Sequence, residues 1–369
     1  MGRMIVFFLA VLGIWALWHA YVAWRAAGLL PSEWERRLVW GIAALLWASY
    51  PLARTLERMT RSPIAGPLEW VAAIAMGTVF IAGVCLIAAD GVTVFGLFWP
   101  GLTRVVRLAA LATAGLMTLA ALGQGLRRPV VRRWEVRLRG LPPALDGTTV
   151  LQLSDLHLGA ILGRSWLERV RRRVEKLHPD VIVFTGDVLD GSVRRTAGLE
   201  KDLSLFSAPK GVWAVTGNHE YYAGLQESVR FMEQAGFHVL RDKAVEAAPG
   251  LVLAGVDDLS ARRSYGDRDG FVRHALAGRP AGGTILLCHS PLSVEDAADS
   301  GAGLMLSGHT HAGQIWPFGE IVRRFYPYLA GRFEVEGMTL IVSRGTGSWG
   351  PPMRLWAPGE MILITLRSE

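Results

Sequence analysis

The pattern of apolar and polar positions divides the chain into two unlike parts. The first third contains four long apolar runs, at about 4–24, 38–52, 70–89 and 108–122. A bilayer core needs about 20 helical residues, so the first and third runs are long enough to span it, and the other two need flanking residues. We therefore expect an all-α transmembrane region of about four spans at 1–125. The segment 92–102 is interpreted as an interfacial helix or a turn between spans.

Two other readings of this region have less support. The first apolar run follows Arg3 and could be a cleaved signal peptide, but more apolar runs follow it and no twin arginine precedes it. A transporter would be expected to carry charges within its spans, whereas His19 and Glu69 lie near span ends. The region is therefore interpreted as an anchor.

From about residue 134 onward, short β-branched and aliphatic runs alternate with amphipathic stretches. The pattern predicts helices at 164–177 and 227–235, and strands at 148–153, 181–185, 211–216, 238–240, 251–255, 284–288, 303–307, 339–343 and 361–365. Such alternation is typical of α/β layers. The short strands toward the C-terminus, with fewer helices between them, suggest a second, antiparallel sheet. We expect this domain at 140–369.

Between the two parts lies a basic juxtamembrane segment, 126–139. Glu135 is its single acidic residue, against six arginines: Arg127, Arg128, Arg132, Arg133, Arg137 and Arg139. Residues 140–369 hold 24 basic and 26 acidic residues, so the net charge of +7 comes from the membrane part and its exit. A nucleic-acid-binding domain would carry the basic face itself. We therefore expect no nucleic-acid partner.

The basic segment also bears on the orientation of the anchor. Arginines near span ends stay on the cytoplasmic side, which predicts a multi-pass protein of the cell (inner) membrane with a cytoplasmic catalytic domain. Arg25, Arg36 and Arg37 in the first outer loop weaken this bias. The same segment could instead bind anionic lipid head groups. Cys85 and Cys288, the two cysteines, lie in apolar runs and predict no disulfide.

Potential metal ligands come directly after the predicted strands, where open α/β sheets build their sites. Residues two apart in an extended backbone point the same way. Asp155 and His157 are such a pair, as are His309 and His311, so the two members of each pair can reach the same small volume. Glycines before three of the ligands permit sharp exits from the strands. In chain order the motifs are Asp155-Leu156-His157, Gly186-Asp187, Gly217-Asn218-His219-Glu220, His289 and Gly308-His309-Thr310-His311.

This order of motifs resembles the calcineurin-like metallophosphoesterase superfamily, over roughly 134–369. The strings LSDLHLG, GNHEYY and GHTHAGQIWP are similar to its membrane-associated branch of the YkuE and YaeI type. Each motif alone is usually a turn or a loop, whereas five in the right order are a specific signal. The resemblance implies a four-layer α-β-β-α sandwich. It also implies two divalent metal ions and a hydrolytic activity on phosphate esters or anhydrides.

Carried over position by position, the resemblance implies a set of ligands. Asp155, His157, Asp187 and His311 would hold one metal, and Asp187, Asn218, His289 and His309 the other, with Asp187 bridging. His219 would be catalytic without binding metal. Two divalent ions can stabilise both the attacking and the leaving oxygen of an in-line displacement at phosphorus. They also lower the pKa of a bridging water, so that hydroxide is available near neutrality. Nitrogen and oxygen donors suit Mn, Fe or Zn.

Other residues are weaker candidates for substrate binding. Tyr222 follows the third motif, Gln314 follows the last motif, and Arg344 lies in a glycine-rich turn. The aromatic and arginine-rich stretch 316–332 is interpreted as a lid or a membrane-facing edge.

Together these patterns predict a membrane-anchored phosphodiesterase or pyrophosphohydrolase that uses a metal-bridging hydroxide. Its phosphate-containing substrate would be lipid-linked or nucleotide-containing, because the anchor holds the site near a bilayer. The alternative is a non-catalytic membrane sensor or scaffold with a metal-binding, hydrolase-like domain, which would be expected to lack ligands. No ligand of the set is missing. The sequence does not predict the oligomeric state.

Overall fold

The computed structural model describes residues 2–59, 64–97, 100–191, 193, 196, 198–266 and 270–369. The chain forms two compact units. The helical unit comprises Met1–Leu126 and Gly350–Leu355, and the sheet unit comprises Arg127–Trp349 and Trp356–Glu369.

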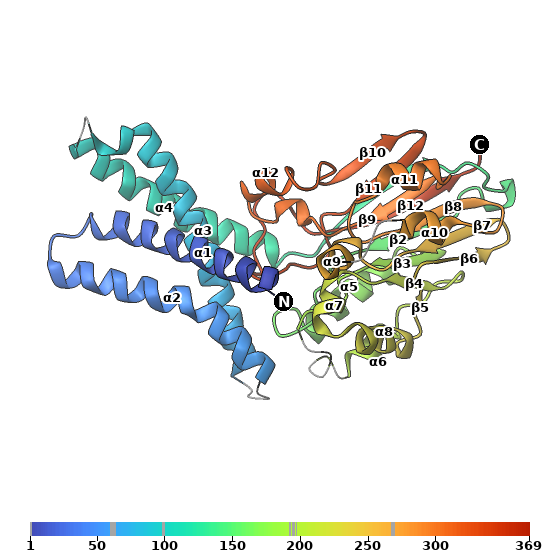
Figure 1. Cartoon of the computed structure of the whole chain (residues 1–369), viewed down its shortest axis with the longest axis horizontal. Helices are drawn as coiled ribbons and strands as arrows, with labels where there is room; N and C mark the ends of the chain where they lie inside the picture. The colour runs from blue at the N-terminus through green and yellow to red at the C-terminus, as the bar shows by residue number, and fades with distance from the viewer. Residues whose placement is uncertain are drawn as a thin grey trace. The chain divides into compact units, whose positions relative to one another are not determined.

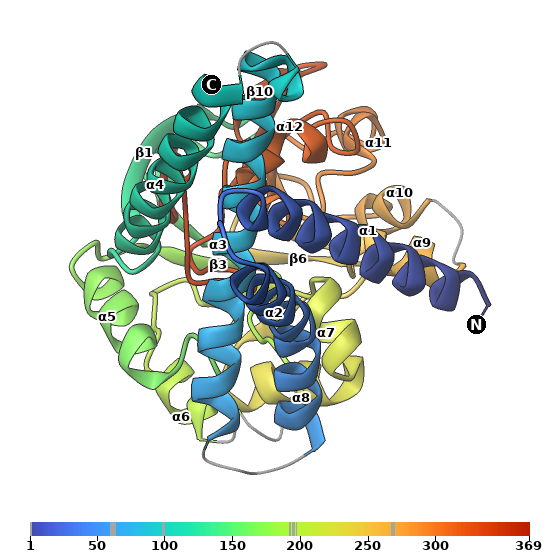
Figure 2. The ribbon, with the colours of Figure 1, turned by 90° about the vertical axis from the view of Figure 1, so that its left-hand side faces the viewer.

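Within the described residues, the helical unit is built from four long helices. They are α1 (Gly2–Ala27), α2 (Glu33–Met59), α3 (Ala65–Val92) and α4 (Pro100–Gly125). Helix α3 contacts each of the other three (Figure 2). Ala65–Val92 and Gly101–Gly125 are long and apolar enough to cross a membrane. The number of spans stays a prediction. Within 92–102, a short 3₁₀ turn covers Val94–Gly96, and residues 98 and 99 lie outside the described part.

Buried ion pairs join the helix ends. At the C-terminal end of α3, Asp90 is 2.6 Å from Arg25 of α1 and 2.8 Å from Arg107 of α4. Toward its N-terminal end, Glu69 is 2.7 Å from Arg54 of α2. A charge removed from water needs a partner of opposite sign. The sequence shows these charges near the ends of the apolar runs, but only the fold shows which ones pair.

A late segment of the chain belongs to the helical unit. The amide of Arg354 donates to the carbonyl of Ala121 in α4 at 2.9 Å. Gly125 leaves room for this segment, because a Cβ there would lie 2.3 Å from the carbonyl oxygen of Pro352. The chain therefore returns to its own helices two hundred residues after leaving them, which the sequence pattern does not predict.

The sheet unit contains two six-stranded sheets (Figure 1). The first has the order β1-β12-β2-β3-β4-β5, formed by Val130–Arg137, Glu360–Arg367, Thr149–Leu153, Val181–Thr185, Val212–Val215 and His238–Val239. The second has the order β10-β11-β9-β8-β7-β6, formed by Gly331–Val335, Met338–Val342, Leu304–Ser307, Gly283–Leu287, Leu251–Gly255 and Lys243–Ala248.

Three apolar cores show how the layers stack. Residues of β2 and β3 pack with α5 (Arg164–Glu175), α6 (Leu199–Leu203) and α8 (Leu225–Gln234) in the first core. Side chains from both sheets form the second core. The third joins β7, β8, β9 and β11 to α9 (Leu259–Tyr265), α10 (Phe271–Leu276) and α11 (Val294–Asp299). The order is helix, sheet, sheet, helix, which confirms the expected four-layer sandwich.

The second sheet is not antiparallel, so that expectation is wrong. Strands β7, β8, β9 and β11 pair in parallel, and only the edge strands β6 and β10 run antiparallel to their neighbours. Parallel neighbours need crossover connections, which here carry α10 between β7 and β8 and α11 between β8 and β9. Each of these helices has six residues, too few for a helical period to stand out in the sequence.

Part of the basic segment 126–139 belongs to the first sheet. Residues Val130–Arg137 form β1, which pairs in parallel with β12 at the edge of the sheet. Arg132 reaches the buried Glu360 of β12 at 2.6 Å. Charged side chains are common on edge strands, where they discourage pairing with other chains. The arginine-rich segment therefore contains a strand of the first sheet, which its charge pattern does not predict.

Candidate metal centre

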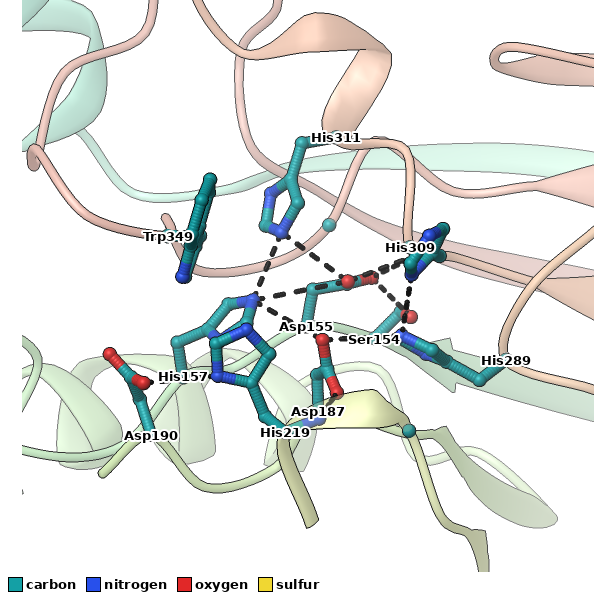
Figure 3. Close-up of polar contacts among 12 residues, drawn as sticks. Ser154, Asp155, His157, Asp187, Asp190, His219, His289, His309, His311 and Trp349 are labelled. Carbon is teal, nitrogen blue, oxygen red and sulfur yellow. Dashed lines mark hydrogen bonds and ion pairs between the residues drawn. The ribbon is translucent and has the colours of Figure 1, made fainter. Parts of the chain in front are cut away.

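The candidate ligands lie where strands of both sheets end (Figure 3). The segments after β2, β3 and β4 carry Asp155, Asp187 and Asn218, the last at the start of helix α7 (Asn218–Ala223). Loops after β8 and β9 carry His289 and His309. Because β2, β3 and β4 are parallel, as are β8 and β9, their C-terminal ends meet at one edge of each sheet. The fold thus brings together motifs that are more than 150 residues apart.

Much of the backbone that carries these residues is strained. Non-glycine residues rarely adopt the left-handed region, and such outliers cluster at functional sites. Five residues of the predicted ligand set do so, namely Asp155 (φ 53°), His157 (φ 49°), Asp187 (φ 52°), His309 (φ 70°) and His311 (φ 50°). Close packing of the loops holds them in this conformation.

Two glycines permit this packing. Gly186 has a φ of +90°, and a Cβ there would lie 2.6 Å from Nδ1 of His289. At Gly308 a Cβ would lie 1.9 Å from Oγ of Ser154, in the loop of Asp155. A side chain at either position would push the two sheets' loops apart, so the glycines of the motifs are needed for space as well as for turning.

One group of donor atoms lies around His157. Its Nε2 is 3.0 Å from Nε2 of His311 and 3.8 Å from Oδ2 of Asp187, and His311 Nε2 is 3.3 Å from Oδ1 of Asp155. Asp155, His157 and His311 are buried and lie close enough to hold one metal ion. Nδ1 of His157 is buried and has no hydrogen-bond partner in the described part of the chain.

A second group lies around His289. Its Nε2 is 3.2 Å from Oδ2 of Asp187 and 3.3 Å from Nδ1 of His309, which is itself 2.9 Å from Oδ1 of Asn218. The other ring nitrogen, Nδ1, donates to the carbonyl of Thr185 at 2.7 Å. This hydrogen bond places the proton of a neutral His289 on Nδ1, so that its Nε2 could serve as a ligand, as in metal-binding histidines. Burial lowers the pKa of His289, but Asp187 outweighs it and raises the pKa well above its ordinary value, so a cation would have to displace a proton from Nε2.

Burial shifts the pKa values of these residues in opposite directions. It raises the pKa of Asp155 to about 6, although His289 opposes the shift. Burial and the neighbouring His219 lower the pKa of His157 to about 3. Burial and His289 lower the pKa of His309 to about 4. Neutral imidazoles beside buried carboxylates offer lone pairs to a cation.

His219 faces the same centre but is held differently. Its Nδ1 is 3.0 Å from Oδ1 of Asp190, and its ring centroid is 4.6 Å from that of His157 (Figure 3). Burial lowers the pKa of His219, but Asp187 and the hydrogen bond to Asp190 outweigh it and raise the pKa above its ordinary value. Asp190 belongs to none of the sequence motifs. Its position three residues after Asp187 is the feature of the sequence that could have identified it.

Glu220 ties two of the loops together. Its Oε2 accepts hydrogen bonds from the amides of Asp187 (2.9 Å) and Gly217 (2.7 Å), and its Oε1 accepts one from Leu189 (3.1 Å). The carboxyl is fully buried, and burial together with Asp187 raises its pKa to about 7. The last residue of the third motif therefore fixes loop geometry rather than facing the donor atoms.

Tyr326 is another contact of the centre that lies outside the sequence motifs. Its hydroxyl lies 2.8 Å from Nε2 of His309, opposite the nitrogen that faces Asn218. It follows α12 (Phe318–Val322), inside the stretch 316–332 interpreted as a lid or a membrane-facing edge. This stretch thus contacts a candidate ligand, and its aromatic content is the single feature of the sequence that points to such a contact.

The three weaker candidates have different surroundings. The ring of Tyr222 lies 5.4 Å from that of His219. The side-chain amide of Gln314 binds the backbone of Trp349, donating to its carbonyl and accepting from its amide, both at 2.9 Å. The guanidinium of Arg344 lies 4.0 Å from the carboxylate of Glu360. Tyr222 thus reaches the centre directly, whereas Gln314 and Arg344 have these other partners. Cys85 and Cys288 are both free thiols, as expected.

Two stacked sheets that present aspartate, asparagine and histidine at their strand ends define a metal-dependent hydrolase. The sequence model of the family described as calcineurin-like phosphoesterase matches residues 148–313. A metallophosphoesterase of Aquifex aeolicus is 36% identical over 245 residues, covering 65% of this chain and 92% of the relative. The chain belongs to the calcineurin-like metallophosphoesterases, hydrolases that act on phosphate esters.

Two further relatives extend the comparison. A protein of Danio rerio named transmembrane protein with metallophosphoesterase domain is 32% identical, covering 76% of this chain and 65% of the relative. The metallophosphoesterase YkuE of Bacillus subtilis is 32% identical, covering 62% of this chain and 82% of the relative. The resemblance to the YkuE type is thereby confirmed.

Proposed function

We propose that the chain is a membrane-anchored phosphohydrolase with a dinuclear metal centre, acting as a phosphodiesterase or pyrophosphohydrolase. One observation carries this proposal. Oδ2 of Asp187 lies 3.8 Å from Nε2 of His157 and 3.2 Å from Nε2 of His289, so the two groups of donor atoms share one carboxylate oxygen. Asp155, His157 and His311 complete one site, and Asn218, His289 and His309 complete the other.

The donor set fits two divalent cations. All its atoms are nitrogen or oxygen, which suits Mn, Fe or Zn. Asp155 and Asp187 supply two negative charges, so a pair of divalent ions leaves the centre positive and attractive to phosphate. When bound, such ions supply Lewis acidity and a water of lowered pKa. The hydrogen bond from Nδ1 of His289 to Thr185, which leaves Nε2 facing the second group, is compatible with this role.

His219 is proposed as the residue that acts on the leaving oxygen. Its Nδ1 is engaged by Asp190, which leaves Nε2 to donate a proton or a hydrogen bond to the substrate. Its backbone amide donates to Oδ1 of Asp187 at 2.8 Å, so the ring is positioned by the shared ligand itself. Asp190 acts through His219 by holding its ring orientation and favouring its charged form.

The anchor and the substrate are proposed together. Two helices are long and apolar enough to cross a membrane, and the Danio rerio relative is named a transmembrane protein. We propose a multi-pass protein of the cell (inner) membrane with its sheet unit in the cytoplasm. The phosphate-containing substrate would be lipid-linked or nucleotide-containing, because such compounds meet the enzyme at the membrane surface. Fusions of a cytoplasmic or a periplasmic reporter to the C-terminus test the orientation, and a periplasmic signal contradicts it.

Hydrolysis of bis-p-nitrophenyl phosphate by purified full-length protein with Mn²⁺ tests the activity. Asp187→Ala and His309→Ala should each lower kcat/KM at least a hundredfold, and a chelator should abolish turnover. His274→Ala provides the control, because this histidine is exposed on α10 and belongs to no motif. Retention of activity by both variants would contradict the shared-ligand centre. Metal binding without turnover of any phosphodiester or pyrophosphate would favour a non-catalytic role.

A further inference from the structure

Trp349 stands beside the candidate centre, although no motif contains it. Its ring centroid is 6.1 Å from that of His219, with the two planes at 75°. Figure 3 shows the indole next to His157 and His219, on the side opposite His289 and His309. An aromatic ring therefore borders the face of the centre where His219 would meet the leaving oxygen.

The position of Trp349 is fixed from its backbone rather than by burial of its ring. Gln314 is 8% exposed, and its side chain binds both the amide and the carbonyl of Trp349. Trp349 as a whole residue is 50% exposed. A ligand that covers a rigidly held, half-exposed aromatic ring removes apolar surface from water, which favours binding.

Tyr222 provides a second aromatic wall. Its ring is 5.4 Å from that of His219, with the planes at 62°, and the residue is 58% exposed. His219 thus has two exposed aromatic residues within about 6 Å, Tyr222 from the short helix α7 (Asn218–Ala223) and Trp349 from a loop near the end of the chain. The guanidinium of Arg344, which could have faced an anionic substituent, lies beside Glu360 instead.

We propose that Trp349 and Tyr222 bind the leaving group of the substrate, and that this group carries a flat, uncharged aromatic ring. This inference rests on the proposed function, because it assigns the leaving group to the side of His219. A nucleobase and an aryl group share the required chemistry. Stacking on an aromatic side chain would discriminate such a group from an alkyl group of similar charge.

The test compares two phosphonates that bind the same centre without being hydrolysed. Calorimetric titration of the Mn²⁺-loaded full-length protein should show phenylphosphonate binding about tenfold more tightly than methylphosphonate. Trp349→Ala should remove most of this preference, Tyr222→Ala should reduce it, and Trp349→Phe should retain it. Trp356→Ala is the matched control, because this exposed tryptophan pairs with Trp316 and not with His219. The affinities of adenosine 5′-monophosphate and ribose 5-phosphate are then compared. Tighter binding of the nucleotide shows that the site accepts a nucleobase, whereas equal affinities show a preference for aryl groups alone.

The outcomes separate this inference from the proposed function. Equal binding of the two phosphonates by the wild type, or an unchanged preference in Trp349→Ala, would overturn the aromatic leaving-group site, whatever the activity. If Trp349→Ala fails to bind Mn²⁺, the phosphonate preferences of the wild type and of Tyr222→Ala are compared instead. An unchanged preference in Tyr222→Ala would then overturn the aromatic leaving-group site. A wild type that prefers phenylphosphonate yet hydrolyses no phosphoester would instead reject the proposed function alone.

Discussion

At the scale of single residues, the centre depends on partners that orient the side chains facing it. Asp155, His157 and Asp187 share a small buried volume, and their left-handed backbone places them there. Around them, Asp190 holds His219, Thr185 holds His289 and Tyr326 holds His309. The motifs could be predicted from the sequence because their spacing is local. Asp190 and Tyr326 could not, because they come from loops without periodicity, and Thr185 acts through a backbone carbonyl that any residue would supply.

The pair of His219 and Asp190 gives the first prediction. His219→Ala should lower kcat about 10² to 10³-fold, since a positioned proton donor contributes that much. Asp190→Asn should lower kcat less, by about tenfold, because it keeps the His219 ring in place but loses the charge that raises the pKa of His219. Steady-state kinetics together with metal analysis check this. Loss of bound metal in either variant would show that the residue has a different role.

Tyr326 gives a prediction about affinity rather than turnover. Partners of metal-binding histidines typically contribute 10 to 100-fold in affinity or activity. Tyr326→Phe removes the hydroxyl that contacts His309 and should weaken binding of one Mn²⁺ by about tenfold, while the other stays bound. Calorimetric titration measures both affinities. Tyr265→Phe, an exposed tyrosine stacked on Tyr221, should bind both ions as the wild type does.

At the scale of elements, strands with a continuous apolar run were predictable and charged or short elements were not. The strand at 181–185 was predicted with the observed bounds, Val181–Thr185, because all five of its side chains are buried. Strand β1 carries Arg132 and Arg133 and reads as a charge run. The crossover helices α10 and α11 are shorter than two helical turns, so the parallel pairing that they permit was missed.

A carboxylate that joins β2 and β3 gives a prediction about stability and pH. Asp180 accepts hydrogen bonds from the amide and the hydroxyl of Thr149, each at 2.8 Å. Burial raises the pKa of Asp180, but these hydrogen bonds outweigh it and lower the pKa below its usual 3.8. A lowered pKa in the folded state stabilises the protein above the unfolded-state pKa. That stabilisation disappears as the pH falls through the folded-state value.

Asp180→Asn should therefore lower the free energy of unfolding at pH 7 by about 1 kcal/mol, near the lower end expected for bonds to a charged group. The lower end applies because this side chain is 35% exposed and solvent screens it. Thermal unfolding of wild type and variant between pH 7 and pH 3 checks this. The difference in Tm should shrink below about pH 4, and a difference that grows on acidification would contradict the account.

At the scale of the whole molecule, the sequence predicts a helical part and a sheet part but not the path of the chain between them. Gly350–Leu355 lies more than two hundred residues after α4 and still belongs to the helical unit. No local pattern marks this segment, because its membership depends on close packing against glycines of α3 and α4. The same limitation applies to Trp349, whose importance follows from its neighbours in space.

The packing of the late segment gives a prediction with a built-in control. Gly125→Ala would place a Cβ 2.3 Å from the backbone carbonyl of Pro352, so it should destabilise the protein by about 1–3 kcal/mol. Gly123→Ala, in the same helix, meets nothing within 4 Å and should be neutral or stabilising by up to about 1 kcal/mol. Thermal unfolding in detergent compares the two. Equal effects of the two variants would place the late segment elsewhere.

In the proposed centre one carboxylate, that of Asp187, joins the two metal sites. The most direct measurement is the metal content of purified full-length protein by mass spectrometry, after loading with Mn²⁺ and removal of free ions. The wild type should retain two ions per chain, Asp187→Ala should lose both, and His274→Ala should retain two. A wild type that holds a single ion, or an Asp187→Ala variant that still holds two, would contradict the account.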